Sequence, residues 1–272
     1  MVTHRVHDFP TTEPIQLDVR NLAGEVRVTA SGQAGARVEL TPLRDDRLTR
    51  DAIEQATVSF SDGRLLVHCE GTGRHLVGRL AQIRVSLLVP DGSSVAAHTV
   101  SAGVRVDGRT DSVEVDTANG DVNVQNVDGE ARVRTASGDI AVGTVTGDLR
   151  VRSLAGTLRC DRVETLRAEL VSGDLTVGEL AGSAELSTAS GDLDIGRVSH
   201  GDLAIHTASG DVRIGVAPGA VAHLSVSTLS GSVRNDLPVE ESAPADGATA
   251  TITIRTLSGD IRINRALASQ PA

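Results

Sequence analysis

The sequence predicts an all-β solenoid, in which one chain winds through a stack of similar coils. The first observation is a Gly-centred tetrad that returns every 17 to 21 residues from Gly103 to Gly231, before a last step of 28 residues to Gly259. A fixed period of this kind indicates stacked repeats. The second observation is the alternation of apolar with polar or small residues between the glycines, which is typical of strands with one buried face.

The tetrad reads TASGD in its most regular copies, which begin at Thr135, Thr188 and Thr207. We expect its glycine to stand at a corner of the coil, where a positive φ is needed. Phosphate-binding loops are not indicated, because neither GxGxxG nor GxxxxGK[ST] occurs. The predicted structural ladder at the turns consists of Gly120, Gly138, Gly156, Gly173, Gly191, Gly210, Gly231 and Gly259.

Each repeat has room for two strands, and equivalent inward positions carry aliphatic residues in nearly every repeat. The predicted inward pairs of one strand are Val122/Val124, Ile140/Val142, Leu158/Cys160, Leu175/Val177, Leu193/Ile195, Val212/Ile214 and Ile261/Ile263. Those of the other are Val113/Val115, Ala131/Val133, Leu149/Val151, Ala184/Leu186, Leu203/Ile205, Leu224/Val226 and Ile252/Ile254. We expect continuous aliphatic columns inside a narrow core. A hydroxyl column, whose members could bond their neighbours from coil to coil, consists of Thr117, Thr135, Ser153, Thr188, Thr207, Thr228 and Thr256.

The N-terminal part is less regular, and we expect it to close one end of the stack, because an open end exposes unpaired backbone groups. Residues 44–56 are the predicted helix, Asp62-Gly63 predicts a hairpin turn, and Pro90 ends a further strand. The predicted domains are a β-rich cap with one short helix over residues 1–99, the solenoid over residues 100–265 and a flexible tail over residues 266–272.

Composition limits the possible partners. The formal net charge of −10 argues against nucleic acid, because there is no basic excess to neutralise phosphates. The chain has no Trp or Tyr and contains only Phe9 and Phe60, so aromatic platforms for bases or sugars are missing.

The first residues lack the basic and apolar regions of a signal peptide, and no apolar stretch is long enough for a membrane span. We therefore expect a cytoplasmic protein. Cys160 falls on an inward column and Cys69 follows an apolar run, so we expect both to be buried core thiols. A disulfide between them stays open.

An aspartate follows the glycine in most repeats. Stacked carboxylates repel one another unless something compensates, and Ca²⁺ is one possible compensator. We favour the alternative, in which each aspartate accepts a turn N–H or meets a nearby arginine. This column consists of Asp121, Asp139, Asp174, Asp192, Asp211 and Asp260.

Catalytic and metal sites are not indicated, and no cofactor is expected. The serine of the tetrad is repeated in equivalent positions, whereas a nucleophile elbow needs one special serine within GxSxG. None of the eight histidines forms HxH, HExxH or a Cys/His cluster with zinc spacing.

The recurring [TS]-[AL]-S-G-D-[VIL]-x-[VI], preceded by a strand that ends in VP, resembles a bacterial family of β-strand repeat proteins. TASGDIAVGTVTGDLRVRS, from Thr135, is close to its consensus. The family is known as a domain of unknown function, and its members are often labelled "putative adhesins". The resemblance covers about residues 15–265 and implies a right-handed parallel β-helix with no catalytic residues to transfer.

We expect a non-enzymatic scaffold or binding module that presents rows of Thr, Ser, Asp and Arg to a protein or glycan partner, or to a second copy of the chain. Glu240, Glu241 and Asp246 lie in an acidic insertion and form a candidate interaction loop. The alternative is a polysaccharide lyase or hydrolase, which needs clustered acids flanked by aromatic sugar platforms. The acids here are periodic rather than clustered, and substitution of Asp174 or Asp192 would test this activity.

Overall fold

A computed structural model describes residues 4–69, 80–237 and 248–266 of the chain. The described part is all-β apart from one short helix, and its strands form a β-solenoid as the sequence predicted. The chain divides into two compact units, Met1–Ala141 and Val142–Ala272, which are described in turn.

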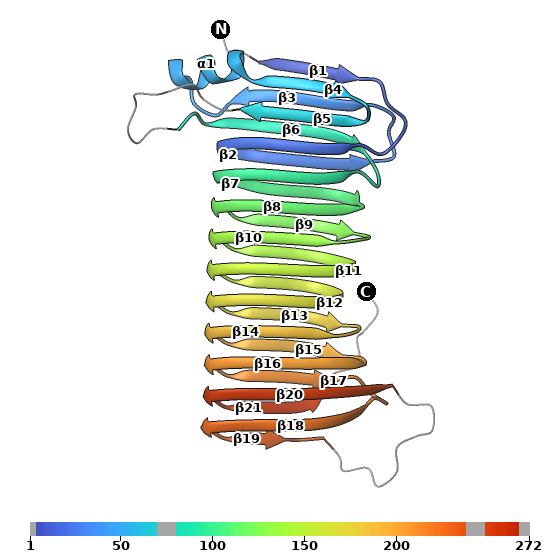
Figure 1. Ribbon diagram of the computed structural model, residues 1–272, viewed down its shortest axis with the longest axis vertical. Coiled ribbons are helices and arrows are strands. Elements are labelled where there is room, and N and C mark those ends of the chain that lie inside the picture. The colour runs from blue at the N-terminus through green and yellow to red at the C-terminus, as the bar shows by residue number, and fades with distance from the viewer. Residues whose placement is uncertain (1–3, 70–79, 238–247, 267–272) are drawn as a thin grey trace. The chain divides into compact units, whose positions relative to one another are not determined.

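The first unit begins with short strands and one helix and continues into regular coils (Figure 1). Its elements are β1 (Arg5–Phe9), β2 (Gln16–Ser31), β3 (Ala36–Pro42), α1 (Arg47–Gln55), β4 (Thr57–Ser61), β5 (Arg64–Cys69), β6 (Ile83–Pro90), β7 (Ser94–Thr110), β8 (Ser112–Asn119), β9 (Val122–Val127) and β10 (Ala131–Ser137).

The strand β2 joins the irregular part of the first unit to its coils. Its two halves pair in parallel with β5 and β6 on one side and with the long strand β7 on the other. β7 then pairs in parallel with β8 and β9. The antiparallel pairs β1–β3, β3–β6 and β4–β5 belong to the irregular part, in which β5 and β6 pair with β2. The predicted hairpin turn is present, with Asp62 and Gly63 both at positive φ.

The helix α1 begins later than predicted, because Asp46 is its N-cap and accepts the Thr49 N–H at 2.8 Å. Ala52 and Ile53 are buried on its inner face. At its other end Arg5 donates to the carbonyls of Ile53 and Ala56 at 2.7 and 3.0 Å. The start of the helix is thus supplied with an acceptor for a free N–H group, and its end is supplied with a donor for free carbonyls.

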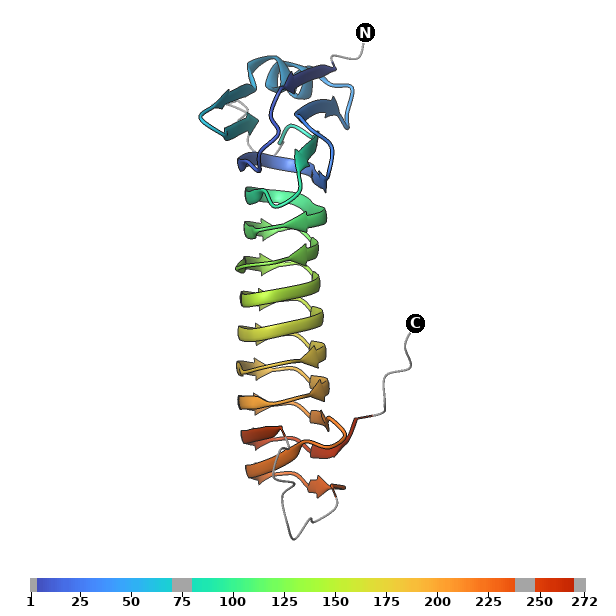
Figure 2. The ribbon, with the colours of Figure 1, turned by 90° about the vertical axis from the view of Figure 1, so that its right-hand side faces the viewer.

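The second unit contains strands alone among its described residues (Figure 2). They are β11 (Ile140–Ala155, which starts at the end of the first unit), β12 (Leu158–Ser172), β13 (Leu175–Leu180), β14 (Ala184–Ser190), β15 (Leu193–Val198), β16 (Gly201–Ser209), β17 (Val212–Val216), β18 (Val221–Ser230), β19 (Val233–Asn235), β20 (Thr249–Ser258) and β21 (Ile261–Arg265).

Each coil of the second unit contributes one strand to each of two parallel ladders. One ladder runs from β12 through β14 to β16, and the other runs from β12 through β13 and β15 to β17. The predicted inward residues of these coils are buried, so aliphatic side chains stack upon one another between the ladders. Burial at about 25 cal/mol per Å² of apolar surface is the main stabilising contribution in such a core.

The last coils are not stacked in the order of the sequence. β20 pairs with β16 on one side and with β18 on the other, and β21 lies likewise between β17 and β19. The coil formed last by the chain is therefore inserted between two earlier coils (Figures 1 and 2). The coil of β18 and β19, which we call the terminal coil, ends the stack.

This order corrects one expectation for the core. Leu224 and Val226 were predicted to be buried, but both are only half-buried because they lie on the terminal coil. Ile252 and Ile254, which are aligned with them on β20, are completely buried. The order also increases apolar burial, since the four isoleucines of β20 and β21 are enclosed. The terminal coil, which is less covered, carries the polar Asn235 at the inward position where β21 has Ile263.

Candidate functional site

The aspartate column is held by backbone hydrogen bonds between coils. In the second unit, Oδ1 of Asp174 accepts the N–H of Asp192 at 2.9 Å, and Oδ1 of Asp192 accepts the N–H of Asp211 at 2.9 Å. In the first unit Asp121 accepts the N–H of Asp139 at 3.0 Å. The interpretation in which the aspartates accept turn N–H groups is confirmed. Within the residues that the structure describes, no three His, Cys, Asp or Glu side chains are grouped so as to hold a metal ion.

The corner glycines stack directly on one another. Gly210 has φ +137°, and a Cβ atom placed on it would lie 2.1 Å from the carbonyl oxygen of Gly191. No other residue fits such a position, because both the backbone conformation and the contact exclude a side chain. A positive φ is shared by the predicted ladder members Gly138, Gly156, Gly173, Gly191, Gly210, Gly231 and Gly259, whereas Gly120 lacks it.

The hydroxyl column differs from the expectation. Thr135, Thr188 and Thr207 each donate to the carbonyl two residues ahead, at 3.0 to 3.3 Å. Only Thr99 and Thr117 are linked hydroxyl to hydroxyl from coil to coil, at 2.8 Å, among the bonds of the described residues. The hydroxyls thus close local turns, which satisfies carbonyls at the coil corner.

A pocket of about 640 Å³, which we call the arginine pocket, opens on the ladder of β13, β15, β17 and β21. It exists because β17 is one residue shorter than its neighbour. Two residues separate Ile195 from Val198 in β15, but only Gly215 separates Ile214 from Val216 in β17. The second residue that β15 carries at this point, Arg197, is therefore missing from β17, and β21 keeps the shorter spacing.

Glycines form the floor of the arginine pocket. Gly178, Gly196 and Gly215 line it in successive coils, and a Cβ atom on Gly215 would lie 2.0 Å from the carbonyl oxygen of Gly196. The backbone is exposed at Gly178 and Gly196 and buried at Gly215, and the charged residues stand at the sides of the floor.

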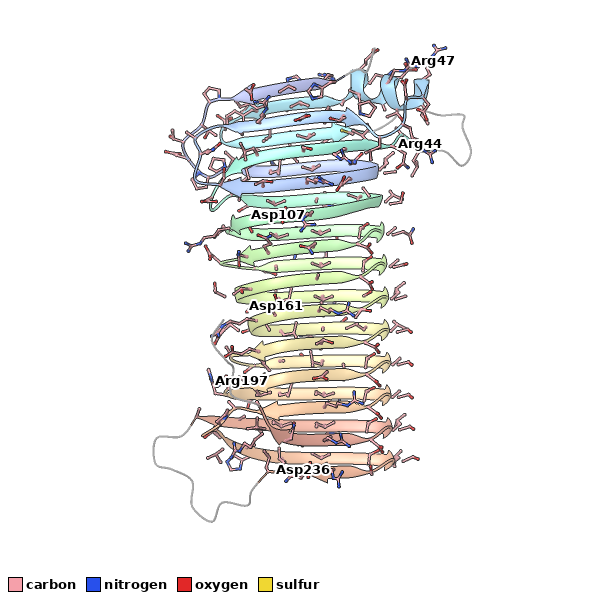
Figure 3. The ribbon with its side chains drawn as sticks, turned by 180° about the vertical axis from the view of Figure 1, so that it is seen from behind. Arg44, Arg47, Asp107, Asp161, Arg197 and Asp236 are labelled. Atoms are coloured by element: carbon pink, nitrogen blue, oxygen red, sulfur yellow. The ribbon has the colours of Figure 1, made fainter. Side chains whose placement is uncertain are left out.

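Four arginines line the pocket, namely Arg197 from β15, Arg213 from β17, and Arg262 and Arg265 from β21. Arg265 is fixed by bonds from Nη1 to the carbonyls of Ala217 and Ala220 at 3.1 and 2.7 Å. The acids that line the pocket, Asp161, Glu179 and Asp194, belong to β12, β13 and β15 (Figure 3 labels Asp161 and Arg197). The lining of β12 and β13 is therefore acidic, β15 contributes both an acid and an arginine, and β17 and β21 contribute arginines.

Two of these arginines, Arg213 and Arg262, belong to a stack that continues beyond the pocket on the same ladder. In successive coils Arg213 is aligned with Arg262, and Arg262 is aligned with Arg234. Neighbouring strands lie about 4.8 Å apart, so these three side chains form a regular row, which we call the arginine row. Arg213 lies 3.6 Å from Asp211, and Arg234 lies 3.7 Å from Asp236.

Sequence reasoning did not find the arginine pocket. The signals were present, since glycine recurs at the same point of three repeats and the repeat containing β17 is short of one residue at that point. The loop that was predicted to interact, with Glu240, Glu241 and Asp246, lies outside the described residues and stays a prediction. Cys69 and Cys160 are free and buried, as expected.

The two parallel ladders, the stacked glycines and the single core define a domain of the β-solenoid class. Residues 143–264 match the family model described as Toastrack DUF4097, which confirms the resemblance to a family of unknown function. A comparison with curated proteins finds no significant match.

Several solved structures are similar in fold. A "putative adhesin" from Bacteroides fragilis NCTC 9343 is 12% identical, with a TM-score of 0.47, and the alignment covers 96% of this chain and 97% of that one. A "putative lipid binding protein" from Parabacteroides distasonis ATCC 8503 is 11% identical, with a TM-score of 0.47 and 97% of both chains covered. A "putative adhesin" from Parabacteroides merdae ATCC 43184 is 14% identical, with a TM-score of 0.43 and 96% and 95% covered. The described part of this chain contains no helix with the length and hydrophobicity of a membrane span.

Proposed function

We propose that the protein is a non-enzymatic binding module whose second unit binds an extended acidic glycan along the arginine row and in the arginine pocket. The observation that carries this proposal is the alignment of Arg213, Arg262 and Arg234 in three successive coils. Asp211 and Asp236 lie 3.6 and 3.7 Å from the two end arginines and compensate part of their charge. A polyanion that passes along the row would offset the remaining repulsion between guanidinium groups stacked at about 4.8 Å and would form new ion pairs.

A regular polymer suits this row better than a folded protein partner. Coil stacking repeats the positive charge at a fixed spacing, and a polyuronate repeats its carboxylates in the same way. Planar guanidinium groups bind carboxylates with two parallel hydrogen bonds. Because the chain has no Trp or Tyr, the sugars would be held by charge rather than by ring stacking, and binding should weaken strongly as salt is added.

The aspartate bonds favour binding over catalysis. Asp174 and Asp192, on which a lyase or hydrolase would depend, each use one carboxylate oxygen to accept a backbone N–H from the next coil. They occupy equivalent places in successive coils, whereas glycoside hydrolysis needs two carboxyl groups in different roles across one bond. We therefore favour a non-enzymatic binding function over polysaccharide cleavage.

We also propose that the coils are right-handed, that residues 1–99 cap the stack and that residues 100–265 form it. A crystal structure would test the winding and both boundaries directly.

Titration calorimetry with polygalacturonate, and with neutral dextran as the control ligand, tests the function. We expect binding of the polyuronate alone, and at least a tenfold loss of affinity in Arg262→Glu, in which the centre of the row is reversed. The matched control is Arg159→Glu, because Arg159 is exposed in the same outward column but is aligned with Thr176 rather than with arginine. Equal binding of dextran, equal losses in both variants or release of unsaturated or reducing ends would contradict the proposal. If an acidic peptide bound and the polyuronate did not, the ligand would be an acidic peptide segment instead of a glycan.

A further inference from the structure

The terminal coil has an open edge. In the described part of the chain, β18 pairs with β20 alone and β19 pairs with β21 alone. Solenoids and sheets normally protect such edges with short strands, charged side chains, proline or bulges. β18 has none of these, since it is 10 residues long, keeps its register with β20 without a shift and contains no Pro, Asp, Glu, Lys or Arg.

The same coil leaves part of the aliphatic core uncovered. Leu224 and Val226 are half-buried, whereas Ile252 and Ile254 directly behind them are inaccessible to solvent. On the other ladder Val233 is 49% exposed. A further coil laid on this end would bury these three side chains and satisfy the unpaired N–H and C=O groups of both strands.

Two charged residues at the end of the terminal coil, Arg234 in β19 and Asp236 directly after it, indicate which coil fits. Arg234 and Asp236 both point outward on the same face, with 3.7 Å between Nε and Oδ1, and Asn235 lies between them (Figure 3 labels Asp236). If two copies of β19 meet antiparallel about Asn235, Arg234 lies opposite the partner's Asp236, and Asp236 lies opposite the partner's Arg234. Opposite charges facing each other across strands are favourable, and like charges are not.

β18 adds no conflict to this arrangement. It contains no Asp, Glu, Lys or Arg, so two copies of the strand bring no carboxylate, ammonium or guanidinium group against its like. Antiparallel strands exchange regular hydrogen bonds along their whole length, and an edge without blocking charges is the usual acceptor for an added strand.

We propose that two copies of the protein associate end to end through their terminal coils, related by a two-fold axis that passes through Asn235. This is an isologous contact, in which each copy offers the same surface. It closes both open ends at once and therefore stops at a dimer.

Sedimentation velocity over a concentration series tests the proposal, with a charge exchange on β19 as its central measurement. Arg234→Asp and Asp236→Arg should each weaken the dimer about tenfold, because each faces like charges across the axis. The double variant Arg234→Asp/Asp236→Arg should restore the wild-type dissociation constant, since the reversed pairs are again complementary.

A second pair of variants tests the edge of β18. Ser225→Lys places a charge on the exposed side of the edge strand and should abolish the dimer. Ala204→Lys is the matched control, because Ala204 and Ser225 are both aligned with Thr253, on the two sides of β20. Thermal melting of every variant shows whether it is folded.

A wild-type protein that stays monomeric at every concentration would overturn the proposal. A dimer that survives Ser225→Lys would overturn the use of the terminal coil, and a charge exchange without recovery would overturn the two-fold axis at Asn235. Because these measurements contain no glycan, they can fail while the proposed binding function stands, and the reverse is also true.

Discussion

Oδ1 of Asp211 accepts the backbone N–H of Asp260 at 3.0 Å, although 49 residues separate the two in the sequence. Oδ1 of Asp260 in turn accepts the N–H of Ser232 at 2.8 Å. The column of carboxylates therefore passes from Asp211 to Asp260 and then back to the turn that precedes β19. This path records in hydrogen bonds the same coil order that the strand pairing shows.

The coil order can be tested by truncating aligned residues. Ile254→Ala should lower the free energy of unfolding by about 2–4 kcal/mol, because the side chain is completely buried and leaves a cavity. Val226→Ala, at the aligned position of the terminal coil, should cost less than about 1 kcal/mol, since the valine is half-buried. Urea denaturation measures both. If the two costs were reversed, the coils would be stacked in sequence order instead.

The aspartate column should stabilise the stack by its hydrogen bonds. Asp211→Ala removes the acceptor of the Asp260 N–H and should lower the free energy of unfolding by about 0.5–1.5 kcal/mol. Asp194→Ala serves as the control, because Asp194 stands on an outward position of β15 and lines the pocket; its effect should stay within about 0.5 kcal/mol. Chemical denaturation that ranks Asp194→Ala as the more damaging change would contradict this role of the column.

Glu25 should contribute to the loss of stability in acid. Burial raises the pKa of Glu25, but the hydrogen bonds and charges of Arg27 and Arg84 outweigh burial and hold its pKa below the ordinary value. Arg84 Nε lies 2.8 Å from the carboxylate. Because the folded-state pKa is the lower one, this stabilisation is complete above the unfolded value of about 4.3 and is lost as the pH falls through the folded-state pKa.

Glu25→Gln should therefore reduce the decline in unfolding free energy between neutral pH and pH values below about 4. Glu54→Gln, on the exposed side of α1, is the matched control. Denaturation curves with equal acid dependence in the wild type and Glu25→Gln would show that the carboxylate makes no such contribution.

The two cysteines should be unreactive in the folded protein. Burial raises the pKa of both Cys69 and Cys160 to about 12, so the thiolate is scarce at neutral pH and reagents cannot reach it. Mass spectrometry after treatment with iodoacetamide at mildly alkaline pH should find no label on the native chain and two labels in denaturant. Rapid labelling of the native protein at Cys160 would mean that the coil around it opens.

The repeat pattern predicted the aliphatic columns well, because inward and outward positions alternate over most of each strand and depart from alternation at the same point of successive repeats, as between Ile195 and Val198. It could not predict the coil order. Leu224 and Val226 satisfy the pattern as fully as Ile252 and Ile254 do, and β18 takes the same register against β20 as β16 does. The two coils differ in how much apolar surface is buried when one or the other stands at the end of the stack. That amount depends on Asn235 and Val233 as much as on the repeat.

The arginine pocket was missed for a different reason. The repeat assigns each residue to a column, but the pocket depends on a residue that is absent, between Gly215 and Val216. Its charge comes from Arg213, Arg262 and Arg265, and the alignment of Arg213 with Arg262 depends on the inserted coil. Neither the cavity nor the arginine row follows from the sequence until the coil order is known.

The inserted coil also has a consequence for biosynthesis. The ribosome delivers β18 and β19 before β20 and β21, and at that moment the open edge of β16 offers β18 a register equivalent to the one it later shares with β20. Leu224 would then stack on Leu203, and a chain that had formed this pairing would have to break it before Ile252 could enter. The stack cannot be completed in the order of synthesis, because β18 and β19 meet their final neighbours only after β20 and β21 have emerged. We expect a slow folding phase wherever the early pairing forms.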